Sequence, residues 1–424
     1  LEYNRMSDHG ANLAKLPIEG ERVEVSKFSK IILGSALIGG IGILISLGIF
    51  LFGGESVINS FSYSWLFACY YFFTIASGGL FWVLLHHASN SGWGIAVRRI
   101  MEHLSNMLPY AFLVFIPILF LQTPREALYE WMHLLRIGEA DYLLKNKAPY
   151  LTMGFFFVRI FFYGFALCGV AYLLRRWSLS QDKTGDVRAT FLARRWSCGF
   201  IPVFAVSVTF IAVDLLMGLD YVWFSTMWGV YIFAGSALSS MAVIILTVTV
   251  LKSRGYLENV VTMQHYHIMG KLMFAFTVFW AYISFSQFFL YWYAKVTEET
   301  KFYILRNTEG WYLVSLFLVF GHFVVPFVFL LRQQAKKDVR QICAAAVWVL
   351  FVHMVDIYWI VIPERGPSIT NGEQLTISGA ILWDVLAFVS VGALMVFLYL
   401  RSMGKYSIYP PRDPRLLESI RLIN

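Results

Sequence analysis

The chain has 424 residues, of which 58% are hydrophobic, 18% are aromatic and only 14% are charged. Ordinary water-soluble domains carry about 25% charged residues, so this composition excludes a soluble globular fold. The formal net charge is +8. Because most of the basic residues lie between apolar runs on one side, this charge gives no reason to expect a nucleic-acid partner.

The apolar residues are grouped in runs of about 20 or more, the length that a helix needs to cross a bilayer core of roughly 30 Å. These runs predict an all-α polytopic membrane protein with ten transmembrane helices. In chain order, the predicted spans are 30–53, 62–86, 104–122, 150–174, 197–217, 224–251, 268–293, 311–331, 341–362 and 378–401. The membrane domain therefore covers 30–401, between an N-terminal segment 1–29 and a tail 402–424.

The basic residues predict the orientation of these spans. Of the 34 Lys and Arg residues, 25 fall on the side of the two termini, 8 fall on the other side, and Arg159 lies within a span. Short cytoplasmic loops carry an excess of Lys and Arg, so both termini are expected in the cytoplasm. The longest connection, 123–149, is expected to form a short amphipathic helix at the surface.

The four cysteines show none of the spacings that bind an iron-sulfur cluster or covalent haem: Cys69, Cys168, Cys198 and Cys343 are scattered. The chain itself is therefore expected to carry no cofactor, and any redox centre would belong to a partner subunit.

Short sequence matches predict an internal repeat, a common feature of membrane bundles. Arg99–Leu104, entering span 3, resembles His267–Leu272, entering span 7. Asp214 and Asp356 occupy similar tripeptides in spans 5 and 9. Spans 2–5 (about 62–217) and spans 6–9 (about 224–362) are thus predicted to form two four-helix bundles, flanked by spans 1 and 10.

Ionisable side chains in hydrocarbon cost several kcal/mol on insertion scales, so each needs a partner or a function. Counted by depth, they are Arg159, Asp214, Asp356 and Asp384 in the outer third, His322 and His353 near the middle, and Glu102, His103, His267 and Lys271 near the cytoplasmic end. Asp356 follows His353 by three residues, which places both on one helix face. Buried Asp, Glu and His build proton relays, so these ten residues are candidates for a proton path.

Other interpretations remain open at this point. Arg159 and Asp214 are equally consistent with a structural ion pair between spans 4 and 5, and Lys271 and Glu102 are close enough to the surface to reach water. His322 and His353 are also at similar depths, as a bis-histidine haem b requires. The aromatic runs 70–73 and 288–293 favour interfacial belts or helix contacts over a quinone pocket.

A resemblance to a known family then adds to this interpretation. The segment 261–287 (VTMQHYHIMGKLMFAFTVFWAYISFSQ) is similar to the signature of the ActF family, membrane subunits of bacterial alternative complex III. The likeness continues, in order along the chain, through GHFVVPF (321–327), WFST (223–226), RWSLSQD (176–182) and RDPRLLES (412–419).

The resemblance implies an NrfD-like subunit of two four-helix bundles in the bacterial cytoplasmic (inner) membrane. It implies quinol:cytochrome c oxidoreductase partners: a paralogous NrfD-like subunit, periplasmic iron-sulfur and multihaem c subunits, and membrane lipids. His322, Lys271, Asp214 and Asp356 lie in family-like stretches. Two positions depart from the family pattern, with Gln at 264 and Lys at 295 in place of Glu and Asn. Both lie at helix ends, which puts only the details of proton entry in doubt.

The expected function is therefore that of a proton-conducting or coupling subunit without its own redox cofactor, within a quinol-oxidising respiratory complex. One alternative is a scaffold that anchors the periplasmic iron-sulfur and haem c subunits. Another is a subunit that itself binds quinol near the outer surface.

Overall fold

A computed structural model describes residues 20–366 and 379–422. Within these residues, ten helices or helix series are long and apolar enough to cross a membrane, which confirms the all-α fold and the predicted number of spans. The spanning elements are α2 (Ser29–Phe52), α3 (Glu55–Ala88), α4–α6 (Ile95–Ser105, Leu108–Leu113, Ile116–Phe120), α10 (Met153–Thr184), α11 (Arg188–Leu215), α12 (Trp228–Ser253), α13 (Met263–Ala294), α15–α16 (Glu309–Leu318, Val325–Leu331), α18 (Val339–Val361) and α19 (Gly379–Met403).

Several helices extend beyond the predicted spans. α4 begins at Ile95 rather than near 104, and α10 continues to Thr184 rather than ending near 174. Hydropathy marks only the part of a helix that lies in hydrocarbon. In α4, the charged turn beyond that part contains Arg98 and Arg99, each of which pairs with Glu102.

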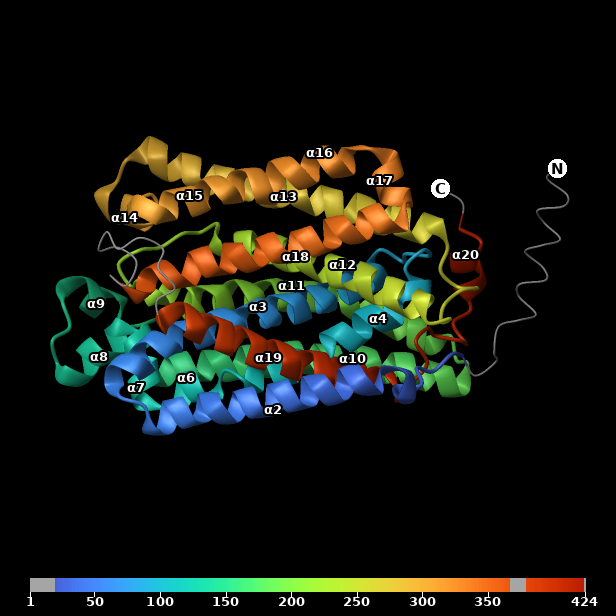
Figure 1. Ribbon diagram of the computed structural model, residues 1–424, viewed down its shortest axis with the longest axis horizontal. Coiled ribbons are helices and arrows are strands. Elements are labelled where there is room, and N and C mark those ends of the chain that lie inside the picture. Colours follow the sequence, from blue (N-terminus) through green and yellow to red (C-terminus); the bar gives the residue numbers. More distant parts are fainter. Residues whose placement is uncertain (1–19, 367–378, 423–424) are drawn as a thin grey trace, which may run out of the picture.

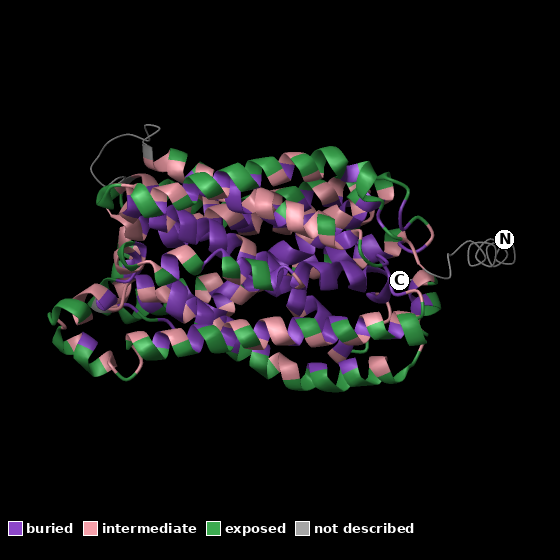
Figure 2. Ribbon diagram, turned by 90° about the horizontal axis from the view of Figure 1, so that it is seen from below, coloured by how far each residue is buried: buried purple, intermediate pink, exposed green. Residues whose placement is uncertain are grey.

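The spans form two four-helix groups with a shared centre. α3, α4–α6, α10 and α11 pack together, as do α12, α13, α15–α16 and α18, and α3 packs directly on α12 between the groups. α19 lies against α3 and carries α2 on its other side. Figure 2 shows the buried residues concentrated along this centre. The first segment, 1–29, is described only from residue 20.

Small residues allow the closest helix contacts. A Cβ added at Gly78 of α3 would overlap the carbonyl oxygen of Ser236 in α12. One added at Gly39 of α2 would lie 2.7 Å from the backbone nitrogen of Leu394 in α19. Apolar side chains gain no hydrophobic energy by leaving lipid for protein, so close backbone contact of this kind is a main source of helix association in membranes.

The connections lie at two opposite ends of the molecule. One end, here called the loop end, carries α7 (Gln122–Leu128), α8 (Glu130–Ile137), α9 (Tyr142–Lys147) and α14 (Thr297–Leu305). The region 123–149, expected to hold a single surface helix, thus contains three short ones. The opposite tail end carries α17 (Gln333–Lys337) and α20 (Leu416–Ile420).

The described start of the chain and the C-terminal tail lie side by side at the tail end. Arg22 and Ser407 form an antiparallel bridge, and the backbone N–H of Ile408 donates to the carbonyl oxygen of Glu21 at 2.9 Å. This pairing holds both segments at the same end of the molecule, and the charge count predicts that both lie on one side of the membrane. Which side that is stays a prediction.

Candidate functional site: a buried histidine–aspartate cluster

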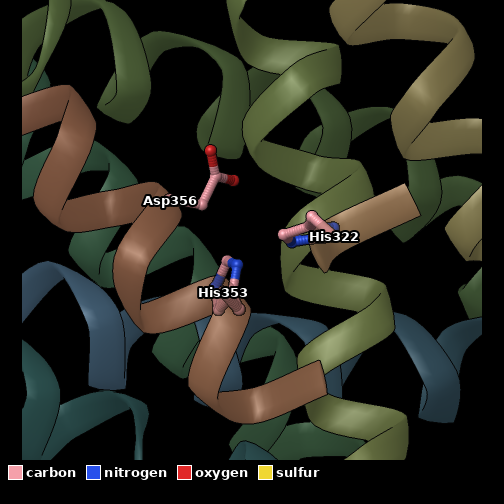
Figure 3. Close-up of side chains that lie close together, drawn as sticks. All are labelled: His322, His353 and Asp356. Carbon is pink, nitrogen blue, oxygen red and sulfur yellow. The ribbon is translucent and has the colours of Figure 1, made fainter. Parts of the chain in front are cut away.

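His322, His353 and Asp356 lie together in the second helix group (Figure 3). One donor atom from each of the three side chains lies within 4.8 Å of the others. His353 and Asp356 come from one face of α18, as their spacing predicts, and His322 faces them from the neighbouring span. All three are buried, with 0%, 1% and 2% of their surfaces exposed. We call these residues the central cluster.

His322 lies in a π-helical turn, Val319–Val324, between α15 and α16. Pro326 follows at the start of α16 and has no backbone N–H to donate to the carbonyl of His322. The regular series of helical hydrogen bonds is therefore interrupted at this point. The carbonyl of Gly321 is free to accept from the indole N–H of Trp348 at 2.7 Å. Such π-turns inside α-helices are frequently found at functional sites.

Asp356 accepts hydrogen bonds from two neutral side chains. The hydroxyl of Tyr231 donates to its Oδ1, and the indole N–H of Trp280 donates to its Oδ2 at 3.1 Å. Trp280 also stacks on His322, with ring centroids 3.7 Å apart and an interplanar angle of 18°. Trp280 therefore fixes the positions of both the carboxylate and the imidazole.

The hydrogen bonds of His353 define which of its nitrogens is free. Its Nε2 lies 2.9 Å from Oγ1 of Thr74, and this hydroxyl donates its single hydrogen to the carbonyl of Tyr71 at 2.6 Å. Nε2 must therefore carry the proton and donate it to Thr74. This leaves Nδ1 of His353 as an acceptor with no hydrogen-bond partner among residues 20–366 and 379–422, and neither nitrogen of His322 has a partner there.

The free nitrogens decide what the central cluster can hold. Two imidazoles and a carboxylate are donors to transition metals, but metal-bound histidines usually hold their second nitrogen on a further partner, which His322 lacks. The imidazole rings of His322 and His353 have centroids 6.4 Å apart and an interplanar angle of 73°, and Trp280 covers one face of the His322 ring. The arrangement better suits a proton shared among the three side chains.

The other predicted carboxylates are paired with arginines. Arg159 and Asp214 form a two-bond ion pair at 2.8 and 2.9 Å, with the guanidinium lying on the ring of Tyr150. Asp384 accepts two bonds from Arg365 at 2.8 and 3.1 Å, and further bonds from Ser64 and Tyr358. The outer candidates therefore form two separate pairs, while Asp356 lies with the histidines.

Glu102 and His103 lie in an arginine cluster at the tail end of the first helix group. Glu102 contacts Arg98 at 3.4 Å, Arg99 at 3.2 Å and Arg175 at 3.7 Å. His103 lies 3.3 Å from Arg175 and 3.0 Å from Ser402. Arg98 also pairs with Asp413 of the tail at 2.7 Å. This cluster joins α4 to α10 and to the C-terminal tail.

His267 and Lys271 occupy a different place, on α13 of the second helix group. The charged neighbours of His267 are Lys271, Lys336 and Lys337. Lys336 lies in α17, between two spans, and its ammonium donates to the carbonyl oxygens of Leu330 and Leu331 at the end of α16. Burial and the charge of Lys271 lower the pKa of Lys336. The four predicted tail-end candidates are thus divided between the two helix groups.

The aromatic runs differ from each other. Tyr70, Tyr71 and Phe73 are buried and make helix contacts, whereas Trp292 and Tyr293 are exposed at the loop end, as expected of an interfacial belt. Sequence reasoning did not identify Trp280, Tyr231, Thr74 or Arg365 as members of polar clusters. The chain matches no family model and no curated protein.

Proposed function

We propose that this protein is a proton-conducting or coupling subunit of a membrane redox complex, and that the central cluster carries the proton. Ten apolar helices among the described residues make it a multi-pass membrane protein. We propose further that it is a subunit of a quinol-oxidising respiratory complex of the alternative complex III type in the bacterial inner membrane. This part of the proposal draws on the sequence resemblance alone.

One observation carries the proton proposal. The buried carboxylates Glu102, Asp214, Asp384 and Asp413 each have an arginine partner, whereas among the described residues Asp356 has only the neutral donors Tyr231 and Trp280. A carboxylate held by arginine keeps its charge, because a second buried charge depends on it. A carboxylate held by neutral donors can gain and lose a proton without leaving a cation unpaired.

The free nitrogens of the histidines supply the other half of the relay. Nδ1 of His353 and both nitrogens of His322 have no hydrogen-bond partner in the part of the chain that the structure describes, and one nitrogen of each ring lies within 4.8 Å of the carboxylate. A small rotation of a side chain would bring a protonated Asp356 into hydrogen-bond reach of an imidazole. The proton would then pass from the carboxyl oxygen to the imidazole nitrogen, and the return rotation would reset the relay.

Iron-sulfur clusters, haem c and quinol are proposed for partner subunits and not for this chain. Those partners are a paralogous NrfD-like membrane subunit and periplasmic iron-sulfur and multihaem c subunits, with lipids around the membrane domain. On the charge count, both termini would face the cytoplasm. The proposal is tested by reconstituting the complex in liposomes and measuring proton movement during quinol oxidation with His322→Ala and Asp356→Asn variants.

A scaffold function is the second candidate, and the arginine pairs favour it for part of the molecule. Arg159–Asp214 and Arg365–Asp384 each join two elements through two hydrogen bonds between opposite charges. If the Asp356 variant moves protons normally, the buried charges are structural throughout and the scaffold function stands. Loss of quinol oxidation in a fully assembled His322→Ala complex would instead favour quinol binding by this chain.

A further inference from the structure

A long cleft separates α13 from α15 in the half of the membrane domain nearest the loop end. Its volume is about 1020 Å³, which is at the upper limit of ordinary ligand pockets. α13 forms one wall through Ser284 and Phe285, and α15 and the π-turn form the other through Leu316 and Val319. In Figure 1, α13 and α15 lie in the outermost layer of the second helix group.

The cleft opens sideways toward the lipid. Phe285, Leu316 and Val319 line it and are also exposed, at 64%, 41% and 54%. Its floor consists of the buried rings of Tyr231, Trp280 and Trp359. Empty space at this depth would forfeit dispersion contacts along both walls, so bilayer hydrocarbon or a dissolved molecule must fill it.

The shape and chemistry of the cleft indicate which molecule fits. On the α15 side it extends from Tyr312 to Val324, a helical length of roughly 18 Å, close to one leaflet of a core roughly 30 Å thick. Among the described residues, none of the side chains that line it carries a charge. The neutral polar groups of Tyr303 and Asn307 lie where the cleft reaches the loop end, at the depth of headgroups.

We propose that this cleft is a binding site for one acyl chain of a phospholipid from the leaflet at the loop end. The chain enters beside Tyr303 and Asn307, extends along α13 and α15, and ends against Trp280. An extended hydrocarbon chain matches the length of the cleft, its lateral opening and its uncharged walls. A charged headgroup stays outside, where the bilayer surface solvates it.

This site borders the central cluster. Trp280 and Tyr231 line the cleft on one side and donate to Asp356 on the other. A bound acyl chain therefore excludes water from this side of Asp356. The lipid site stands without the proposed function, whereas its effect as a seal against proton leak rests on it.

The test uses the complex purified from membranes and placed in nanodiscs with a phospholipid that carries a diazirine on one acyl chain. The sample is washed with excess unlabelled lipid and irradiated, and the labelled peptides are identified by mass spectrometry. Retained label is expected on the cleft walls of α13 and α15. On α2, whose Leu37 and Leu44 are exposed and do not line this cleft, the label is expected to wash away.

Filling the cleft gives the matched comparison. Ser284→Trp is expected to abolish the retained label on α15, and Val319→Phe serves as a second, smaller filling variant. Leu44→Trp on α2 is the control and should leave the label unchanged. Absence of retained label in the wild type, or label that is unaffected by both filling variants, would overturn the proposal. So would retention of a photoreactive isoprenoid quinone in place of the phospholipid. None of these readouts depends on proton movement.

Discussion

Trp280 connects the two chemical partners of the central cluster: its ring stacks on His322 with centroids 3.7 Å apart, and its indole N–H donates to Asp356 at 3.1 Å. One side chain thereby holds an imidazole and a carboxylate in fixed positions. Proton transfer between them requires one of these two contacts to break. Trp280 is therefore a positioning residue in the proposed relay.

Replacing Trp280 separates its two contacts. Trp280→Phe keeps an aromatic ring over His322 but removes the donor to Asp356, so we expect a folded complex whose proton movement has an altered pH profile. Trp280→Leu removes both contacts and should lower the rate further. The measurement is the pH dependence of proton movement in liposomes. Identical pH profiles for Trp280→Phe and the wild type would show that this hydrogen bond has no part in the relay.

The Arg159–Asp214 pair is expected to affect stability and not proton conduction. Asp214→Asn leaves the buried guanidinium without its charge partner, and breaking such a pair costs about 3–5 kcal/mol. Replacing both members with apolar residues, as in Arg159→Met with Asp214→Leu, should recover most of that loss. Thermal unfolding in detergent measures both effects. A stable Asp214→Asn protein that has lost proton movement would place this pair in the conduction path.

Asp413 is expected to hold the C-terminal tail on the first helix group. It accepts from Arg98 at 2.7 Å, and Arg98 also contacts Glu102. Asp413→Ala should release the segment around α20 and leave the spans intact. Limited proteolysis from the tail end measures this as faster cleavage after residue 404. Unchanged cleavage would mean that Ser419 and the Arg22–Ser407 bridge hold the tail without Asp413.

The loop end contains a pH-sensitive contact outside the spans. Burial opposes ionisation of Glu126, but hydrogen bonds from Arg136 at 2.7 and 2.8 Å and from His133 at 3.2 Å outweigh it and hold its pKa below the ordinary value. A carboxylate whose pKa is lower in the folded state stabilises the fold at pH values above its unfolded-state pKa. This stabilisation is lost as the pH falls through the folded-state pKa. Hydrogen exchange in α7 and α8 should therefore rise only under acidic conditions, below about pH 4.3.

Glu126→Gln is the control for this contact. It removes the charge at every pH, so exchange in α7 and α8 should be raised at neutral pH and should respond less to acid than in the wild type. A variant that keeps the wild-type acid response would assign the response to another group.

The sequence was sufficient for the parts of the structure that depend on local pattern. The bilayer length of each apolar run predicts the spans, and the three-residue spacing of His353 and Asp356 predicts their shared face. The pairing of Arg365 with Asp384 could not be predicted, because it depends on how the end of α18 packs beside α19. Nor could the roles of Trp280 and Thr74, which lie on helices distant in sequence from α18.

The division of the four tail-end candidates between the two helix groups could not be predicted either, because it also depends on how distant helices pack. Counting residues along a helix gives the depth of Glu102 and His267 but not the helix group to which each belongs. Hydropathy also cannot show that α4 continues through Arg98 and Arg99, because charged helical turns and polar loops have similar compositions. The π-turn at His322 is signalled in part by Pro326, because a proline four residues after His322 cannot donate a backbone hydrogen bond to its carbonyl oxygen.

The most direct test of the central claim is proton movement per quinol oxidised by the complex in liposomes, comparing the wild type with Asp356→Asn. Asp384→Asn is the matched control, because it also neutralises a buried carboxylate but at an arginine pair. The account predicts that Asp356→Asn loses proton movement beyond that of quinol chemistry while electron transfer continues, and that assembled Asp384→Asn keeps it. A full proton yield from Asp356→Asn would contradict the account and leave the central cluster with a structural function.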